Sequence, residues 1–263
     1  MLRVDPVIIV ASDVHLGYEK SNSESFARFL GRCAGLDLEH FVLLGDLLDF
    51  WRSNNAQAII GSGDILGGLG RLKAGQIHYV PGNHDFLIHK LAERYPERYP
   101  FHVCKKLTLE QKGTVYNFIH GHELEVLANL EPMTIEAYEK MSERMCFTEH
   151  FLGGYASFLW DLVENRHELA GKAEYVRKPA HERGFDRVRE LATSAGAYLL
   201  VGMRPGESLV YGHTHRPFID KEKGVVNTGS WVDEEPEGRP RNTYVTIEGG
   251  RMELREFGKD TFP

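Results

Sequence analysis

Short apolar runs recur along the chain, and each is followed by a small residue and then by a polar one. The runs are "VIIVASDVH" (7–15), "FVLLGDLLD" (41–49), "IHYVPGNHD" (77–85), "VYNFIHGH" (115–122) and "SLVYGHTH" (208–215). Continuous apolar runs bounded by turn residues predict buried strands. The first run is too short and too interrupted by aspartates for a signal peptide, so it predicts the first strand.

Helix-length segments separate the early strands. "SESFARFLGRCAGL" (23–36), for example, places Phe26, Phe29 and Leu30 at helical spacing. Strands that alternate with helices indicate an α/β fold, and such folds bind ligands beyond the carboxyl ends of their strands. We therefore expect one site that is assembled from five strand ends.

A helical insertion separates the polar residues near 122 from those near 213. We expect one domain over residues 1–263, with the insertion as a helical cap at about 128–195. The segments "IEAYEKMSERM" (135–145) and "FLGGYASFLWDLV" (151–163) each place aromatic and aliphatic residues on one helical face. Packing on the body explains most of this surface. The alternative is a lid over the site, because aromatic and methionine-rich faces adapt to apolar ligands.

Composition narrows the classes of protein to consider. With 42% hydrophobic and 26% charged residues, the chain has an ordinary globular composition, and it contains no apolar stretch long enough to cross a bilayer. A net charge of −7 argues against a long nucleic acid as the main partner. Cys33, Cys104 and Cys146 form no C-x-x-C pair, which predicts reduced thiols in a cytoplasmic protein.

The strand ends supply many side chains that can bind metals. They are Asp13, His15, Asp46, Asp49, Asn83, His84, His120, His122, His213 and His215. Oxygen ligands mixed with imidazoles suit Mn, Fe or Zn better than Mg or Ca alone, and the lack of thiolates excludes a structural zinc site. One ion cannot use so many ligands. Two divalent ions about 3.5 to 4 Å apart with a shared carboxylate could, and they would form a site for in-line displacement at phosphorus.

These residues occur in blocks that resemble, in order, the five signature blocks of the calcineurin-like metallophosphoesterases. The blocks are Asp13-Val-His15, Gly45-Asp46-x-x-Asp49, Gly82-Asn83-His84-Asp85, His120 within "HGH", and Gly212-His213-Thr214-His215. The resemblance implies an α/β, four-layer αββα sandwich in which helices flank two mixed β-sheets. It also implies a phosphoester hydrolase in which a metal-bridging hydroxide attacks phosphorus in line.

The resemblance also assigns roles by position. Asp13, His15 and His215 would hold one metal ion, and Asn83, His120 and His213 the other, with Asp46 between them. His84 would act on the substrate by stabilising charge or protonating the leaving group, and Asp85 would orient His84 through a hydrogen bond. Asp49 would fix the loop that aims Asp46, and His122 would stand behind the ligands or face the substrate. Mn is the foremost candidate for the two divalent ions, with Fe, Zn and Mg as alternatives.

The substrate is less narrowly indicated. "GDLLDFW" (45–51), "YGHTHRP" (211–217) and "NTGSWV" (227–232) resemble the branch that contains UDP-2,3-diacylglucosamine pyrophosphatases, in which a helical cap covers acyl chains. That branch carries Gly-Asn-Arg-Asp, whereas His84 replaces the arginine here and can also release a proton. We expect a phosphodiester or pyrophosphate substrate that is nucleotide-linked or amphipathic, which would allow peripheral contact with a membrane.

Three alternatives stay open. "SDVHLGY" (12–18) resembles the opening block of repair nucleases in the same superfamily, although the acidic net charge weighs against a nuclease. A phosphodiesterase or phosphatase for small nucleotides is the second alternative. A metal-binding scaffold without catalysis is the third, and the complete ligand set argues against it.

Overall fold

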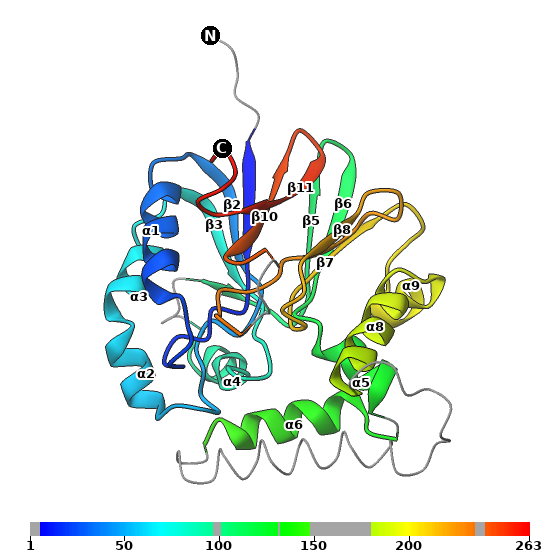
Figure 1. Cartoon of the computed structure of the whole chain (residues 1–263), viewed down its shortest axis with the longest axis horizontal. Helices are drawn as coiled ribbons and strands as arrows, with labels where there is room; N and C mark the ends of the chain where they lie inside the picture. The colour runs from blue at the N-terminus through cyan, green and yellow to red at the C-terminus, as the bar shows by residue number, and fades with distance from the viewer. Residues whose placement is uncertain (1–5, 97–100, 131, 148–179, 235–239) are drawn as a thin grey trace.

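The computed structural model describes residues 6–96, 101–130, 132–147, 180–234 and 240–263, and within these ranges the strands form two sheets (Figure 1). The first has the order β11-β10-β1-β2-β3-β4 and comprises β1 (Val7–Ala11), β2 (Leu38–Leu43), β3 (Ala74–Tyr79), β4 (His102–Val103), β10 (Thr243–Glu248) and β11 (Arg251–Glu256). The second has the order β5-β6-β7-β9-β8 and comprises β5 (Leu107–Gln111), β6 (Thr114–Phe118), β7 (Ser208–Tyr211), β8 (Phe218–Asp220) and β9 (Val225–Asn227).

Both sheets are mixed, and parallel strands form the centre of each. In the first sheet β1, β2, β3 and β4 run parallel, and β10 lies antiparallel to β1. In the second, β6, β7 and β9 run parallel, and β5 and β8 are antiparallel to their neighbours. The five strands that the sequence predicts are therefore confirmed. Their parallel pairing brings the loops after β1, β2 and β3, and those after β6 and β7, to a common end of each sheet.

The apolar runs are buried on both faces, as their lack of alternation predicts. Ile8, Val10 and Val42 point between the two sheets, where they meet Phe118 and Val210 of the second sheet. Their neighbours in the strands point to the opposite face and join the cluster that packs under the helices. The sheet-to-sheet layer thus holds the two halves of the polar edge together.

Helices cover the outer face of each sheet. On the first sheet, α1 (Ser23–Cys33), α2 (Asn55–Gly61) and α3 (Gly63–Leu69) contribute Phe26, Phe29 and other apolar residues to one cluster. On the second sheet, α5 (His122–Asn129), α8 (Ala180–Ala192) and α9 (Ala195–Val201) pack through Leu124 and Val188 against Leu209. Figure 1 shows the resulting order of helices, sheet, sheet and helices. The expected four-layer αββα sandwich is confirmed.

Two parts of the expected insertion can be described. Helix α6 (Ile135–Met145) lies across the end of the sandwich, beyond α4 (Leu87–Arg94) and α5 (Figure 1). Cys146, which follows α6, places its Sγ 3.4 Å from the carbonyl oxygen of His84. Helix α8 instead packs on the second sheet and belongs to the outer layer. The predicted segment 151–163 lies outside the described residues, and among those described no helix is long and apolar enough to cross a membrane.

Candidate metal centre

The backbone at the strand ends adopts a conformation that non-glycine residues rarely have. Asp13, His15 and Asp46 have φ values of 53°, 52° and 52°, and His213 and His215 have φ values of 66° and 56°. The left-handed region costs L-residues energy and is concentrated at functional sites, where the surrounding structure enforces it. The strain lies on residues that the sequence predicts as metal ligands.

The glycines before Asp46 and Asn83 have a steric explanation. A Cβ atom added to Gly45 would lie 2.1 Å from Nδ1 of His120, and one added to Gly82 would lie 2.1 Å from Oδ1 of Asp46. Both distances are far below van der Waals contact. Glycine at these positions therefore allows one strand end to reach the ligand of another, which explains why the small-then-polar pattern recurs.

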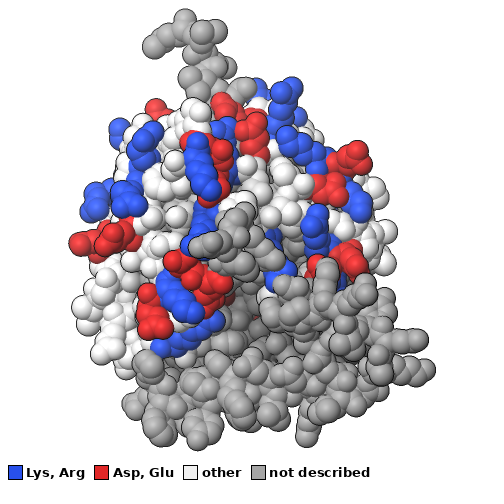
Figure 2. Space-filling model, in the orientation of Figure 1, with Lys and Arg blue, Asp and Glu red and all other residues white. Residues whose placement is uncertain are grey.

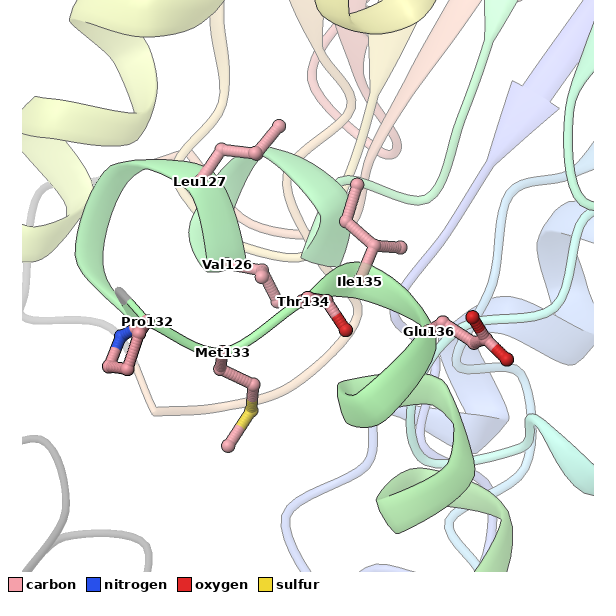
Figure 3. A pocket seen from close by; sticks show the side chains of 7 residues that line it. All are labelled: Val126, Leu127, Pro132, Met133, Thr134, Ile135 and Glu136. Carbon is pink, nitrogen blue, oxygen red and sulfur yellow. The ribbon is translucent and has the colours of Figure 1, made fainter.

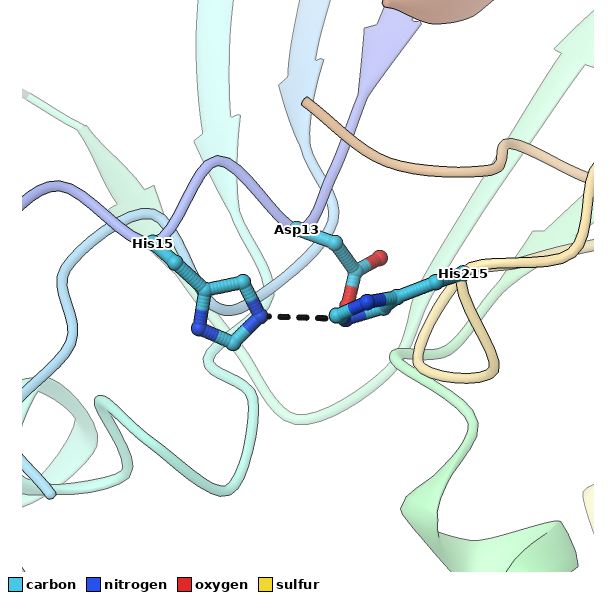
Figure 4. A group of neighbouring side chains, drawn as sticks. All are labelled: Asp13, His15 and His215. Carbon is cyan, nitrogen blue, oxygen red and sulfur yellow. Dashed lines mark hydrogen bonds and ion pairs between the residues drawn. The ribbon is translucent and has the colours of Figure 1, made fainter. Parts of the chain in front are cut away.

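Predicted ligands, joined in one case by His84, form three overlapping groups, each with its candidate atoms within 4.8 Å of one another. Figure 4 shows the first group, in which Nε2 of His15 lies 3.1 Å from Nε2 of His215, and Nε2 of His215 lies 3.4 Å from Oδ1 of Asp13. Asp46 belongs to the other two groups. The three groups are Asp13, His15 and His215; Asp46, His120 and His213; and His15, Asp46 and His84.

Asp46 lies between the two outer groups. Its Oδ2 is 3.3 Å from Nε2 of His120 and 3.8 Å from Nε2 of His15, and its side chain is almost fully buried. Asn83 completes the second group, because its Oδ1 lies 3.1 Å from Nε2 of His120. The structure therefore brings all seven predicted ligands together around one buried carboxylate.

Hydrogen bonds on the far side of two imidazoles determine which nitrogen faces the centre. Nδ1 of His15 lies 3.0 Å from Oδ2 of Asp49, and Nδ1 of His120 lies 2.9 Å from the carbonyl oxygen of Leu44. Because these oxygens only accept, each Nδ1 carries a proton, and in the neutral imidazole the lone pair is left on Nε2. A lone pair on Nε2 is what a metal ion requires from a neutral histidine.

Asp49, and not Asp85, holds the imidazole of His84. Nδ1 of His84 lies 3.0 Å from Oδ1 of Asp49, and the ring stacks on Trp51 with a centroid distance of 4.3 Å. The same Oδ1 accepts the backbone N–H groups of Trp51 and Arg52. Asp49 therefore fixes the turn that follows it and also positions both His15 and His84.

The prediction that Asp85 orients His84 through a hydrogen bond was wrong. Asp85 points back into the turn, where its carboxylate accepts from the backbone N–H groups of Gly82 and Leu47 at 2.8 and 2.7 Å. The Tyr79 hydroxyl donates to the same carboxylate at 2.5 Å. Burial, together with the charge of Asp46, raises the pKa of Asp85 to about 6. Asp85 thus ties the loop after β3 to the loop after β2.

The charges of the buried groups are matched. Burial favours the neutral form of Asp46, but His120 and His84 outweigh it and hold the pKa of Asp46 well below its usual range. Burial also opposes a charge on His120, yet Asp46 and Asp13 raise the pKa of His120 to about 10. Without metal, the protonated His120 offsets part of the charge of the neighbouring carboxylates. The residues fit metal ions, which would take the place of this proton.

His122 and Glu125 lie behind the centre on α5. The ring of His122 is 2% exposed and stacks on Tyr138 of α6, and neither of its nitrogens has a hydrogen-bond partner among the described residues. Glu125 was missed from the sequence. Its carboxylate is buried and hydrogen-bonded to Nε2 of His213. A glutamate between the apolar Leu124 and Val126, one helical turn after "HGH", was the available signal.

A family model for calcineurin-like phosphoesterases matches residues 6–217, which contain every ligand described above. The chain belongs to the calcineurin-like phosphoesterase family. It is therefore a phosphoester hydrolase of a family that uses divalent metal ions. This match confirms the expected family. It does not identify a branch within the family.

Comparisons with individual proteins add no finer assignment. No curated protein sequence matches the chain. Among solved structures, it is similar to a dimetal phosphatase from Danio rerio, with 11% identity, 98% of this chain and 97% of that chain covered, and a TM-score of 0.48. It is also similar to the phosphoesterase Yfce from E. coli, with 14% identity, 97% of this chain and 95% of that chain covered, and a TM-score of 0.46. A third similar structure is an archaeal phosphodiesterase, with 16% identity, 95% of this chain and 98% of that chain covered, and a TM-score of 0.46. Likeness at this level carries no argument about the substrate.

Proposed function

We propose that this phosphoesterase hydrolyses a phosphodiester or pyrophosphate bond at a dinuclear centre. Asp13, His15 and His215 would hold one ion, and Asn83, His120 and His213 the other. The observation that carries the proposal is the position of Asp46, whose Oδ2 lies within 4 Å of a histidine from each set. A buried carboxylate between two ligand sets is what two neighbouring cations require.

The charge of the ligand set supports phosphate binding. Two divalent ions contribute +4, and Asp13 and Asp46 contribute −2, which leaves +2 for an anionic substrate. When bound, the ions would lower the pKa of water and neutralise charge on the phosphoryl oxygens. Asn83 preserves the surplus because it is a neutral ligand. Mn is our foremost candidate, with Fe, Zn and Mg as alternatives.

Asn83→Asp tests this charge argument. The added carboxylate should leave two ions bound and slow the hydrolysis of a phosphodiester, because the surplus falls from +2 to +1. Metal content and turnover of bis-p-nitrophenyl phosphate are the measurements. If the variant bound metal normally and hydrolysed the diester as fast as wild type, the charge argument would fail.

His84 is the residue that we assign to proton transfer. Asp49 accepts from its Nδ1, so the opposite nitrogen, Nε2, is available to give a proton to the leaving-group oxygen. Trp51 stacks on the ring and limits its rotation. Asp85 contributes by holding the turn that carries His84 and Asn83.

An open apolar pocket on the helix that begins at His122 supports an amphipathic substrate. Figure 3 shows the pocket at the junction of α5 and α6, and its volume is about 570 Å³. Its lining is mainly aliphatic and consists of Val126, Leu127, Pro132, Met133, Thr134, Ile135 and Glu136. The pocket adjoins the helix that carries His122 and Glu125. A nucleotide-linked or lipid-linked substrate similar to UDP-2,3-diacylglucosamine would place its polar part at the metals and its apolar part here.

Surface charge favours a small substrate over a long nucleic acid. On the face in Figure 2, basic and acidic side chains are interspersed over the described residues, and the net charge is −7. A nuclease gains affinity from a continuous basic surface that displaces counterions. We therefore consider a nuclease less favoured than an enzyme for an amphipathic substrate. We also rank a phosphodiesterase or phosphatase for small nucleotides below it. We also propose a cytoplasmic location with peripheral membrane contact.

One screen separates these functions. Protein purified with manganese would be assayed for metal content and for turnover of bis-p-nitrophenyl phosphate, p-nitrophenyl phosphate, a nucleotide-diphosphate sugar and single-stranded DNA. We expect two ions per chain and turnover of the diester and the diphosphate sugar. Cleavage of DNA alone would indicate the nuclease, and turnover of p-nitrophenyl phosphate alone a phosphatase. Two bound ions without turnover of any compound would indicate a scaffold.

A further inference from the structure

Glu125 and the metal centre lie on opposite sides of the imidazole of His213. The carboxylate of Glu125 is hydrogen-bonded to Nε2 of the ring, and the Glu125 residue is 8% exposed. On the other side, Nδ1 of His213 lies 3.3 Å from Nε2 of His120. That same Nε2 lies 3.1 Å from Oδ1 of Asn83. His213 therefore bridges α5 and the second ligand set.

This contact determines the protonation of the ring. An ionised carboxylate can only accept, so Nε2 of His213 must carry the proton, and Nδ1 keeps its lone pair toward the centre. His120 has the opposite arrangement, because its Nδ1 is held by the carbonyl oxygen of Leu44 and its Nε2 faces inward. The two histidines of the second set thus present different nitrogens, and the position of the acceptor behind each ring is the reason.

The two halves of the centre share this device. Asp49 holds His15 from behind in the first half, and Glu125 holds His213 from behind in the second. We propose that Glu125 is a positioning residue that fixes the Nδ1 lone pair of His213 on the second metal ion and so sets the affinity of that ion. This inference rests on the proposed function and deepens it.

Metal titration of Glu125→Gln tests the inference against a matched control. Glu139→Gln is the control, because Glu139 is equally buried at 8%, lies on the adjacent α6, pairs with Lys105 and His122, and contacts no proposed metal ligand. Calorimetric titration of metal-free protein with Mn²⁺ should give two ions for wild type and for the control. In Glu125→Gln, whose amide oxygen accepts from Nε2 more weakly than a carboxylate does, the first ion should bind as in wild type and the second about 10- to 100-fold more weakly.

Two further measurements separate positioning from general damage. In a His213→Ala background, adding Glu125→Gln should cause no further loss of metal affinity, because the imidazole through which Glu125 acts on the metal is absent. Histidine side-chain ¹H–¹⁵N spectra of the metal-free and Zn²⁺-loaded protein should show His213 protonated at Nε2, and Glu125→Ala should lose this preference.

The inference is overturned if Glu125→Gln and Glu125→Ala both bind the second ion with wild-type affinity. It is also overturned if Glu125→Gln lowers affinity equally in the His213→Ala background. Failure of the proposed function looks different: wild type itself would bind fewer than two ions or hydrolyse no phosphoester. The tautomer of His213 in metal-free protein would still report on Glu125 in that case.

Discussion

Asp49→Asn would reverse one of the hydrogen bonds that prepare the centre for metal. In wild type, Oδ1 of Asp49 accepts from Nδ1 of His84 and from two backbone N–H groups. Its Oδ2 accepts from Nδ1 of His15 at 3.0 Å and from the half-exposed guanidinium of Arg52 at 3.3 Å, which can turn to solvent. The oxygen of asparagine should take the Oδ1 position. The opposite orientation would leave buried N–H groups facing a donor, at a cost of about 1 to 3 kcal/mol for each.

The amide NH₂ would then face Nδ1 of His15. To accept from it, His15 must move its proton to Nε2, the nitrogen that lies 3.1 Å from His215 and faces the centre. A protonated Nε2 cannot bind a metal ion. We expect the ion held by Asp13, His15 and His215 to bind about 10- to 100-fold more weakly, which corresponds to about 1.4 to 2.7 kcal/mol.

Asp85→Asn is the matched comparison, because Asp49 and Asp85 are both fully buried carboxylates. Asp85 contacts backbone N–H groups and Tyr79 but no proposed ligand side chain. Its variant should lower the free energy of unfolding by about 1 to 3 kcal/mol and leave Mn²⁺ affinity near that of wild type. Calorimetric titration and urea unfolding measure the two quantities. Wild-type affinity for both ions in Asp49→Asn would refute the reasoning.

Three other predictions concern single groups. His84→Ala should keep both metal ions and lower turnover by about 10² to 10⁴-fold, and loss of metal instead would mean that His84 is a ligand. Gly45→Ala should destabilise the metal-free chain by about 2 to 4 kcal/mol in urea unfolding, because its Cβ collides with His120 at a φ of 84°. Gly113→Ala, at a φ of 79° with open space around it, should cost less, and equal losses would exclude the collision as the cause. Burial beside His40 and His102 lowers the pKa of His78 to about 4. Between pH 6.5 and 4 the unfolded chain therefore binds more protons than the folded chain, and the free energy of unfolding should fall as the pH falls through that window. The loss should be on the order of 1 kcal/mol in wild type and smaller in His78→Gln, and an equal loss in both would contradict this origin.

The amino-acid pattern alone predicted the strands and placed candidate ligand side chains at their ends. Short apolar runs that do not alternate and are bounded by turn residues indicate strands buried on both faces, and parallel strands end at a common edge. Side chains that directly follow such runs, Asp13 and Asp46 among them, therefore meet wherever the sheets place that edge. The sequence also shows a glycine before a candidate ligand, because the close approach at Gly45 is a local requirement of the strand end.

Only the tertiary structure decided which carboxylate serves which imidazole. Asp85 is adjacent to His84 in the chain but points into its own turn, whereas Asp49, 35 residues away, reaches the ring. Glu125 could not be predicted as the partner of His213, because a contact between residues 88 apart depends on how α5 packs on the second sheet. Hydrogen bonds behind the ligands follow side-chain direction in the packed molecule, and sequence neighbourhood does not determine that direction.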